Sequence, residues 1–291
     1  MTRATNGDVE LAYEVGGRPG GEPVVFVEGL GYGRWMWRWQ RDALADEYRT
    51  ILWDNRGTGD SDTPEGPYTI EEMAGDLEAV LADAGVDRAH LIGASMGGMI
   101  AQRYALEYDR AATLSLLCTT PGGPEAVPVP EETQAAIFAV PEDGDERERI
   151  RHRMAPAVSD TFFEENPDVT EDIVDWRLES DASDAARKAQ AAGVAEFDVA
   201  DEVSALDVPV VILHGSDDRV VPVENGRLLE NLIPHARLEV CDGGHHLFFV
   251  ERSDWVNDRV FDFLDANPIG ADLEAGGEST AEAALEAGDR E

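Results

Sequence analysis

At Gly93-Ala94-Ser95-Met96-Gly97-Gly98 the chain carries the pattern Gly-x-Ser-x-Gly, and the rest of the sequence is interpreted from this stretch. An apolar run over 89–92 precedes it, and 99–105 have the composition of a helix start. A strand, a sharp turn and a helix are the context in which this pattern marks a nucleophile elbow. The glycines allow close backbone approach, and the turn strains Ser95. The stretch therefore predicts a serine hydroxyl at a strand end, beside a helix N-terminus that favours negative charge.

Strands and helices alternate on both sides of this stretch. The Asn6-Gly7 turn within 3–13 predicts a hairpin, and Thr69 with Glu72 forms a capping box that starts a helix. A continuous apolar run predicts a strand buried on both faces at 23–27, another buried strand is predicted at 111–118, and further strands are predicted at 48–53 and 208–213. This alternation predicts an α/β fold with a mostly parallel sheet and helices on both faces. In such sheets active sites gather at the carboxyl ends of the strands.

The pattern changes after the strand that ends near Cys118. From 119 to about 205 the chain holds prolines, carboxylates and amphipathic helical pieces such as 137–154 and 174–192, which predicts a helical insertion. Strands then resume, and a last helix covers 255–264. From about 268 glycine, alanine and acidic residues predict a disordered tail or a frayed helix. The predicted division is core 1–118, cap 119–205, core 206–266 and acidic tail 267–291.

The charge of the chain is strongly negative, with 23 basic against 61 acidic residues and a net charge of −38. Lys188 is the only lysine. Such a charge repels nucleic acids and anionic membranes, so neither is an expected partner. Because salt screens the self-repulsion, we hypothesise adaptation to a salt-rich cytoplasm. The alternative is an ordinary acidic protein with an acidic tail, but acidic residues are dense throughout.

Compartment and metal content are also constrained by the sequence. No run approaches the roughly 18 apolar residues of a membrane helix, and residues 1–8 lack the apolar segment of a secretory signal. Cys118 and Cys241 each end an apolar run and are interpreted as small buried hydrophobes in a reducing compartment. Neither has metal-ligand spacing. We therefore expect a cytoplasmic protein with no metal, and the sequence does not predict its oligomeric state.

A serine nucleophile needs a general base, usually a histidine that a carboxylate orients. His245 and His246 follow the last predicted strand in a Gly-Gly-His-His loop, so one of these two is the predicted base. His214 closes a strand and is interpreted as structural, and His152 lies in the insertion. His90 and His235 precede strands, which places them at the wrong end of the sheet.

The orienting carboxylate is expected after a strand that lies between the serine and the histidine. Asp217 or Asp218 follows the 208–213 strand, whereas Glu125 is a weaker candidate at the boundary of the insertion. The resulting order is serine, aspartate, histidine. This order matches the α/β-hydrolase arrangement and excludes the orders of the chymotrypsin and subtilisin types.

Four separated motifs carry a resemblance to a known family. They are Glu28-Gly29-Leu30-Gly31, the Asp-x-Arg-Gly-x-Gly-x-Ser loop over 54–61, the Ser95 stretch, and Gly215-x-x-Asp218-x-x-x-Pro222 with Gly244-His245. From about residue 8 to 264 the chain resembles the α/β-hydrolase superfamily, in its serine-nucleophile branch. It is most similar in character to cofactor-free esterases and lactonases, such as 3-oxoadipate enol-lactonases and polyketide methylesterases.

The resemblance implies roles for individual residues. It implies an α/β-hydrolase fold with a helical cap inserted after the sixth strand, and no cofactor. Asp218 and His245 would be the partners of Ser95, and the backbone N–H groups of Leu30 and Met96 would form the oxyanion hole. Relatives usually carry His-Gly where this chain has Glu28 and Gly29. A carboxylate there is expected to disfavour an anionic substrate, unless Arg34 or Arg56 neutralises it.

The predicted function is hydrolysis of a small carboxylic ester or lactone through an acyl-enzyme. The same triad can support carbon–carbon bond hydrolysis or cofactor-free perhydrolysis, which remain alternatives. Ser95 argues against the members of this fold that use an aspartate nucleophile. A non-catalytic ligand-binding protein of the same fold is the alternative from another class, and it predicts a broken triad.

Overall fold

The computed structural model describes residues 1–138 and 144–270. It contains one eight-stranded sheet with strand order β1-β2-β4-β3-β5-β6-β7-β8. The strands from β4 to β8 pair in parallel, whereas β1 and β2 run antiparallel at one edge. Their bounds are β1 Thr2–Asn6, β2 Val9–Gly17, β3 Pro23–Val27, β4 Arg49–Trp53, β5 Ala89–Ala94, β6 Ala111–Leu117, β7 Val210–Gly215 and β8 Arg237–Cys241.

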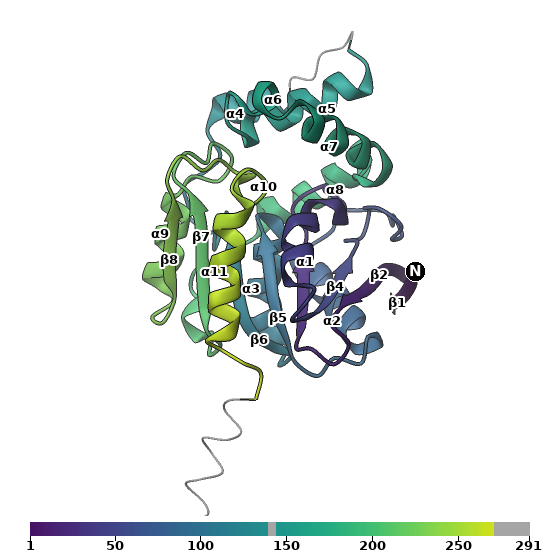
Figure 1. Ribbon diagram of the computed structural model, residues 1–291, viewed down its shortest axis with the longest axis vertical. Coiled ribbons are helices and arrows are strands. Elements are labelled where there is room, and N and C mark those ends of the chain that lie inside the picture. The colour runs from purple at the N-terminus through teal and green to yellow at the C-terminus, as the bar shows by residue number, and fades with distance from the viewer. Residues whose placement is uncertain (139–143, 271–291) are drawn as a thin grey trace, which may run out of the picture.

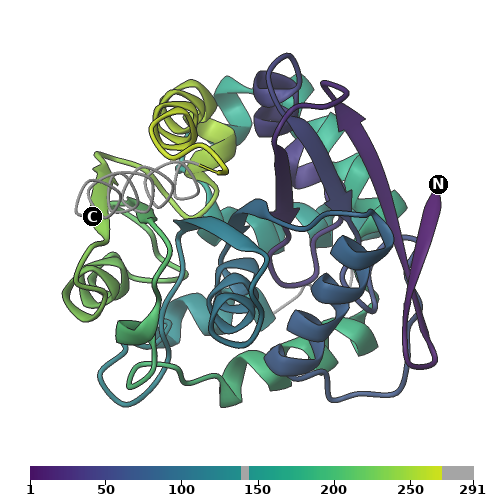
Figure 2. The same ribbon diagram turned by 90° about the horizontal axis from the view of Figure 1, so that it is seen from below.

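Helices cover both faces of this sheet, as Figure 2 shows in a view from below. In that view α1 (Arg38–Leu44) and α11 (Ser253–Asp265) lie on one side, and α2 (Ile70–Asp83), α3 (Met96–Glu107) and α9 (Glu224–Leu232) lie on the other. A short helix, α10 (Phe248–Glu251), precedes α11. Two 3₁₀ segments of the core are η1 (Arg34–Trp37) and η3 (Val203–Ala205).

The strands feed two hydrophobic cores because successive side chains point to opposite faces. In β3, Val25 and Val27 pack in the core under α2 and α3, while Val24 and Phe26 pack in the core under α1 and α11. All four side chains are fully buried. This two-sided burial explains why the strand is continuously apolar, and it confirms the parallel sheet predicted from the sequence.

Two local predictions are confirmed in detail. The Asn6-Gly7 turn joins β1 to β2 in an antiparallel hairpin, and Gly7 has a φ of 60°. Thr69 caps α2: its hydroxyl accepts from the Glu72 amide at 3.1 Å, while the Glu72 carboxylate accepts from the Thr69 amide at 2.9 Å. Each capping partner satisfies one helix-terminal N–H group that has no intrahelical acceptor.

A layer of helices follows β6 and lies over the carboxyl ends of the strands, at the top of Figure 1. These helices are α4 (Glu131–Phe138), α5 (Glu146–Met154), η2 (Ala155–Ala157), α6 (Phe162–Glu165), α7 (Pro167–Ser180) and α8 (Asp184–Glu196). The insertion after the sixth strand confirms the predicted fold class. The finer division of the chain stays a prediction, and 271–291 of the predicted tail lie outside the described residues.

Two helical pieces predicted within the cap were too long. The piece 137–154 is not one helix. Asp145 caps the start of α5, where its carboxylate accepts from the Glu148 amide at 2.9 Å. Residues 139–143 lie outside the described residues. The piece 174–192 is divided between α7 and α8. There Asp181 turns toward the core, where its Oδ1 accepts from the Trp35 indole at 2.8 Å. Ser183 then caps α8. In the described part of the chain no helix has the length and apolar character needed to cross a membrane.

The net charge of −38 leads to a prediction about salt. In dilute buffer the Debye length is about 30 Å at 0.01 M, so the carboxylates repel one another and unfolding relieves that repulsion. We expect the melting temperature to rise as KCl increases from about 0.05 to about 3 M, steeply at first. Thermal melting followed by circular dichroism measures this. Sucrose at equal osmolality is the control and is not expected to substitute, and a flat melting temperature would reject salt adaptation.

Candidate active site

Ser95 occupies the sharp turn between β5 and α3, as the Gly-x-Ser-x-Gly pattern predicts. Its φ of 55° and ψ of −119° are rare for a residue that is not glycine. Backbone and side-chain contacts from β6 hold this conformation: the Ser95 amide donates to Leu117 O at 2.9 Å, and the Thr119 hydroxyl donates to Ser95 O at 2.7 Å. The side chain of Ser95 is half-buried, so part of it stays accessible.

The backbone packs so closely around the turn that Gly93 and Gly97 have no room for a side chain. A Cβ atom on Gly97 would lie 2.0 Å from Val27 O, and one on Gly93 would lie 2.4 Å from Gly97 O. Side chains at these positions would push α3 away from the end of β3. The glycines therefore bring the start of α3 against the loop that follows β3, which contains Leu30.

Two backbone N–H groups are free at this point of contact. Within the described residues, neither the Leu30 amide nor the Met96 amide donates to another protein atom. Met96 is the first residue of α3, whose N-terminal amides have no acceptor within the helix. Free donors at a helix N-terminus suit an anion, such as the oxygen of a tetrahedral intermediate.

Asp218 lies in the loop after β7 and is 7% exposed. Its Oδ1 accepts from the amides of Val220 at 2.8 Å and Val221 at 2.9 Å, so one oxygen is fixed by the backbone. Its Oδ2 accepts from Nδ1 of His246 at 2.8 Å. Burial alone raises the pKa of Asp218, but the facing His246 and His214 outweigh it and lower that pKa below the ordinary value. Asp218 therefore holds a stable negative charge against a histidine.

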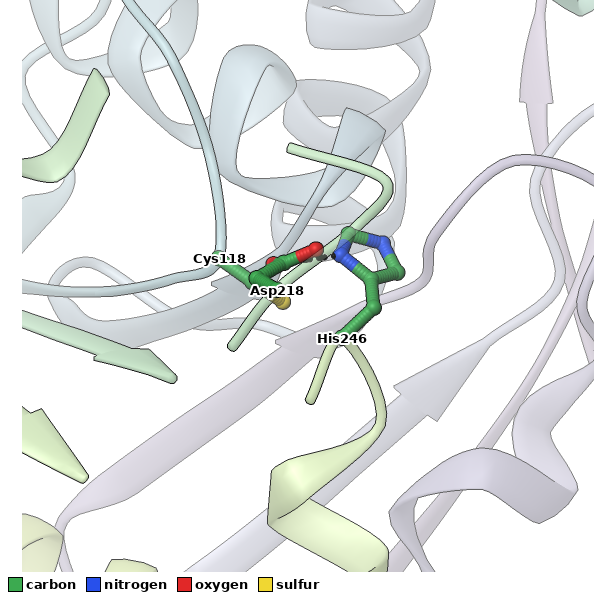
Figure 3. Close-up of side chains that lie close together, drawn as sticks. All are labelled: Cys118, Asp218 and His246. Atoms are coloured by element: carbon green, nitrogen blue, oxygen red, sulfur yellow. Dashed lines mark hydrogen bonds and ion pairs between the residues drawn. The ribbon is translucent and has the colours of Figure 1, made fainter. Parts of the chain in front are cut away.

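That histidine is His246, which is 5% exposed (Figure 3). The prediction that Asp218 orients His245 is wrong by one residue. The His245 side chain is half-buried, and its buried Nδ1 has no hydrogen-bond partner among the described residues. Burial lowers the pKa of His246, but the charge and hydrogen bond of Asp218 together with the nearby Cys118 outweigh burial and raise that pKa well above the ordinary value. Asp218 thus stabilises the imidazolium form of His246.

Of the other predicted candidates, the side chains of Asp217 and Glu125 form no hydrogen bond or ion pair with this pair in the described part of the chain, whereas His214 lies behind Asp218, with its Nε2 3.4 Å from Asp218 Oδ2. Asp217 is exposed and accepts from the Ser216 hydroxyl at 2.8 Å, while Glu125 is also exposed. His214 is fully buried and its Nε2 bonds to Val221 O at 2.8 Å, which agrees with the structural role expected for it.

Cys118 connects the pair to the elbow. It follows β6 directly, has a φ of 41° and is fully buried. Its sulfur lies within 4.8 Å of the facing atoms of Asp218 and His246, and burial raises the pKa of the thiol. The residue before it, Leu117, accepts from the Ser95 amide at 2.9 Å, so the end of β6 contacts the Ser95 turn and also places Cys118 beside His246. The sequence analysis treated Cys118 only as a small hydrophobe, and its burial gave no signal of this neighbourhood.

Neither of the two arginines considered in the sequence analysis pairs with Glu28. Arg34 pairs with Asp54 at 2.9 Å and Arg56 pairs with Asp76 at 2.6 Å, and neither forms an ion pair with Glu28. Glu28 is 1% exposed, and burial together with the Asp54 charge raises its pKa well above the ordinary value. Glu28 is therefore biased toward the uncharged acid, which removes much of the expected penalty for an anionic substrate.

The cap holds the loop that carries Leu30. Gln190 in α8 is fully buried and accepts from the Gly31 amide at 2.7 Å. Its amide nitrogen donates to Arg56 O and to the Thr58 hydroxyl, each at 3.0 Å. The Ala182 amide in turn donates to Gly31 O at 3.0 Å. The Leu30–Gly31 peptide is thus fixed from the cap side, through a glutamine that stands in no motif.

The geometry agrees with comparisons to known proteins. A family model described as alpha/beta hydrolase fold matches residues 22–253. The chain belongs to this family. It is 29% identical to 3-oxoadipate enol-lactonase 2 of Acinetobacter baylyi over 239 residues, which are 82% of this chain and 87% of that protein. The family membership and the similarity to this lactonase show that the chain is a hydrolytic enzyme, as predicted.

Two solved structures show the same architecture. One is a thermophilic esterase from Thermogutta terrifontis, with a TM-score of 0.76, 32% identity and coverage of 91% of this chain and 99% of that one. The other is the enol-lactonase from Burkholderia xenovorans, with a TM-score of 0.80, 26% identity and coverage of 91% and 100%. The predicted α/β-hydrolase fold is confirmed by these similarities and by the sheet.

Proposed function

We propose that Ser95, His246 and Asp218 form a catalytic triad that hydrolyses a small carboxylic ester or lactone. The single observation that carries the proposal is the buried Asp218–His246 hydrogen bond of 2.8 Å, set beside a strained Ser95. The esterase and lactonase names of the similar proteins support the bond type. No cofactor is needed for this chemistry, because serine and histidine supply the nucleophile and the base.

In this mechanism the Nδ1–H of His246 stays bonded to Asp218, which leaves Nε2 free to accept the Ser95 proton. Ser95 Oγ attacks the carbonyl carbon, and the carbonyl oxygen becomes an oxyanion that the Leu30 and Met96 amides stabilise. His246 then gives the proton to the departing alkoxide, and an acyl-enzyme remains. Water, deprotonated by His246, attacks the acyl carbon and releases the acid and Ser95.

A substrate panel tests the bond type. Purified protein in high salt is offered p-nitrophenyl esters of graded acyl length, lactones, and substrates for carbon–carbon hydrolysis and perhydrolysis. We expect turnover of esters or lactones, and a fluorophosphonate probe should add its mass to the peptide that contains Ser95. Turnover of only the carbon–carbon or perhydrolysis substrates would replace the proposed reaction, and no labelling with no turnover would favour a binding protein.

Replacement of Asp218 by asparagine should lower kcat by about 10⁴, because asparagine favours the wrong histidine tautomer. Asp217→Asn is the matched control one residue away, and we expect it to change kcat less than about tenfold since the Asp217 side chain is exposed and, among the described residues, bonds only to the Ser216 hydroxyl. Steady-state kinetics on the best ester of the panel measures both. If Asp217→Asn lost more activity than Asp218→Asn, the assignment of the orienting acid would be wrong.

Replacement of Gln190 by leucine should lower kcat by about tenfold with little change in KM. The substitution leaves the Gly31 amide without its acceptor, so the neighbouring Leu30 donor is less well fixed. Complete loss of one oxyanion donor lowers kcat by a factor of about 10² to 10³, and a misplaced donor lowers kcat by less.

The matched control is Gln134→Leu, at an exposed glutamine in α4 that bonds only to Val129 O. Gln190→Glu keeps the acceptor for Gly31 and should retain more activity than Gln190→Leu. If Gln190→Leu instead raised KM about tenfold and left kcat unchanged, Gln190 would shape substrate binding and would not position the Leu30 donor.

A further inference from the structure

Cys118, Asp218 and His246 form a cluster of three different metal-ligand types. One ligand atom from each, the thiol sulfur, a carboxylate oxygen and a ring nitrogen, lies within 4.8 Å of the other two. All three side chains are buried and point toward one another (Figure 3). They follow β6, β7 and β8, so the cluster is anchored by three neighbouring strands.

For a tetrahedral ion to bind among these atoms, the His246–Asp218 pair must open. Zinc lies about 2.3 Å from sulfur and about 2.0 to 2.2 Å from nitrogen or oxygen, which sets ligand pairs roughly 3.3 to 3.7 Å apart. The Nδ1–Oδ2 separation of 2.8 Å between His246 and Asp218 must open by roughly 0.5 Å to admit the ion. Three protein ligands leave a fourth position for water.

The ligand set selects the kind of ion. A thiolate and an imidazole favour soft or borderline cations such as Zn²⁺ and Cd²⁺, whereas Mg²⁺ and Ca²⁺ prefer oxygen ligands alone. The Asp218 carboxylate and a Cys118 thiolate also neutralise a divalent charge. This matters because an uncompensated charge in so buried a place is costly.

We propose that Cys118, Asp218 and His246 bind one Zn²⁺ or Cd²⁺ ion, and that this ion switches the hydrolase off. On binding, the Cys118 S–H bond breaks, a metal–sulfur bond forms and the thiol proton leaves to solvent. The ion replaces the proton on Nδ1 of His246, and the ring stays neutral by carrying its proton on Nε2. An Nε2–H group cannot accept the Ser95 proton. The inhibitory half of this proposal rests on the proposed function.

Cadmium titration tests the site directly, because a cadmium–thiolate bond gives an ultraviolet charge-transfer absorption that carboxylates do not give. The titration is run in about 1 M potassium nitrate, where the Debye length is about 3 Å, so that ions held diffusely by the acidic surface are screened. Cys241→Ala is the matched control, because Cys241 is the only other cysteine and is also buried. Mg²⁺ is the hard-ion control.

We expect the absorption to saturate at one Cd²⁺ per chain in the wild type and in Cys241→Ala, and to disappear in Cys118→Ala. Each protein's hydrolysis is compared with its own rate without metal. The concentration that halves the rate should rise at least tenfold in Cys118→Ala, EDTA should restore wild-type activity, and Mg²⁺ should have no effect at equal concentration. Cys118→Ser serves in the same way if the alanine variant does not fold.

The proposal is overturned if wild type shows no thiolate absorption, if the absorption persists in Cys118→Ala, or if Cys118→Ala is inhibited as strongly as wild type. The absorption is also measured in Ser95→Ala, where it should remain although turnover is lost. A chain that binds Cd²⁺ through Cys118 but hydrolyses no substrate would keep the metal site and overturn the inhibitory half together with the proposed function.

Discussion

Replacement of Ser95 by alanine is expected to lower kcat by about 10⁶ while the fold stays intact. Loss of the nucleophile from a serine triad costs this much because the remaining groups no longer act as a unit. Alanine has the same backbone restriction as serine at a φ of 55°, so the turn gains no new strain. Circular dichroism and melting temperature should match those of the wild type, and the fluorophosphonate label should be absent.

Ser115→Ala is the matched control for this experiment. Ser115 is a fully buried serine within β6, and its hydroxyl has no hydrogen-bond partner among the described residues. The same atom is removed in both variants, but only Ser95 stands at the carboxyl end of a strand beside free amide donors. Residual activity of Ser95→Ala within about tenfold of the wild type would contradict a serine nucleophile.

The core of the fold could be predicted because its signals are local or periodic. Continuous apolar runs mark the strands that are covered on both faces, and Thr69 with Glu72 marks a helix start by its own capping chemistry. The Ser95 turn is equally readable, since the clash distances at Gly93 and Gly97 leave no room for a side chain. In each case the residues that give the signal are those that make the structure.

The cap could be located but not described, because its breaks depend on contacts with distant residues. At the helix break Asp181 bonds to Gly33 and Trp35 across the interface with the core, and these bonds leave no signal in the sequence, whereas the Ser183 cap of α8 is local. Gln190 likewise gains its importance only where α8 meets the Gly31 amide. Such contacts join residues more than a hundred positions apart, which a pattern within one segment cannot show.

The sequence could not show which of the two histidines bonds to Asp218, for a related reason. Position after the last strand predicts the loop that carries the base, but His245 and His246 share that position, and one backbone step decides which ring turns toward Asp218. In the structure the backbone amides of Val220 and Val221 fix Asp218, and its Oδ2 accepts from Nδ1 of His246. The buried Nδ1 of His245, by contrast, has no hydrogen-bond partner among the described residues.

His246→Ala should therefore lower kcat by about 10⁶, as loss of the base does in a serine triad, whereas His245→Ala should change it less than about tenfold. The two variants remove the same ring from adjacent positions, so each is the control for the other. Steady-state kinetics in high salt, with melting temperatures to confirm folding, measures both. A larger loss in His245→Ala would restore the assignment made from the sequence.

A double variant separates a base from a residue that merely shapes the pocket. Groups that act in one proton-transfer unit are strongly non-additive, so Ser95→Ala combined with His246→Ala should lose no more activity than either single variant. If the loss of kcat in the double variant equalled the product of the two single losses, the His246 ring would contribute independently of the nucleophile. That result would be incompatible with His246 as the base that takes the Ser95 proton, even if the single variant were inactive.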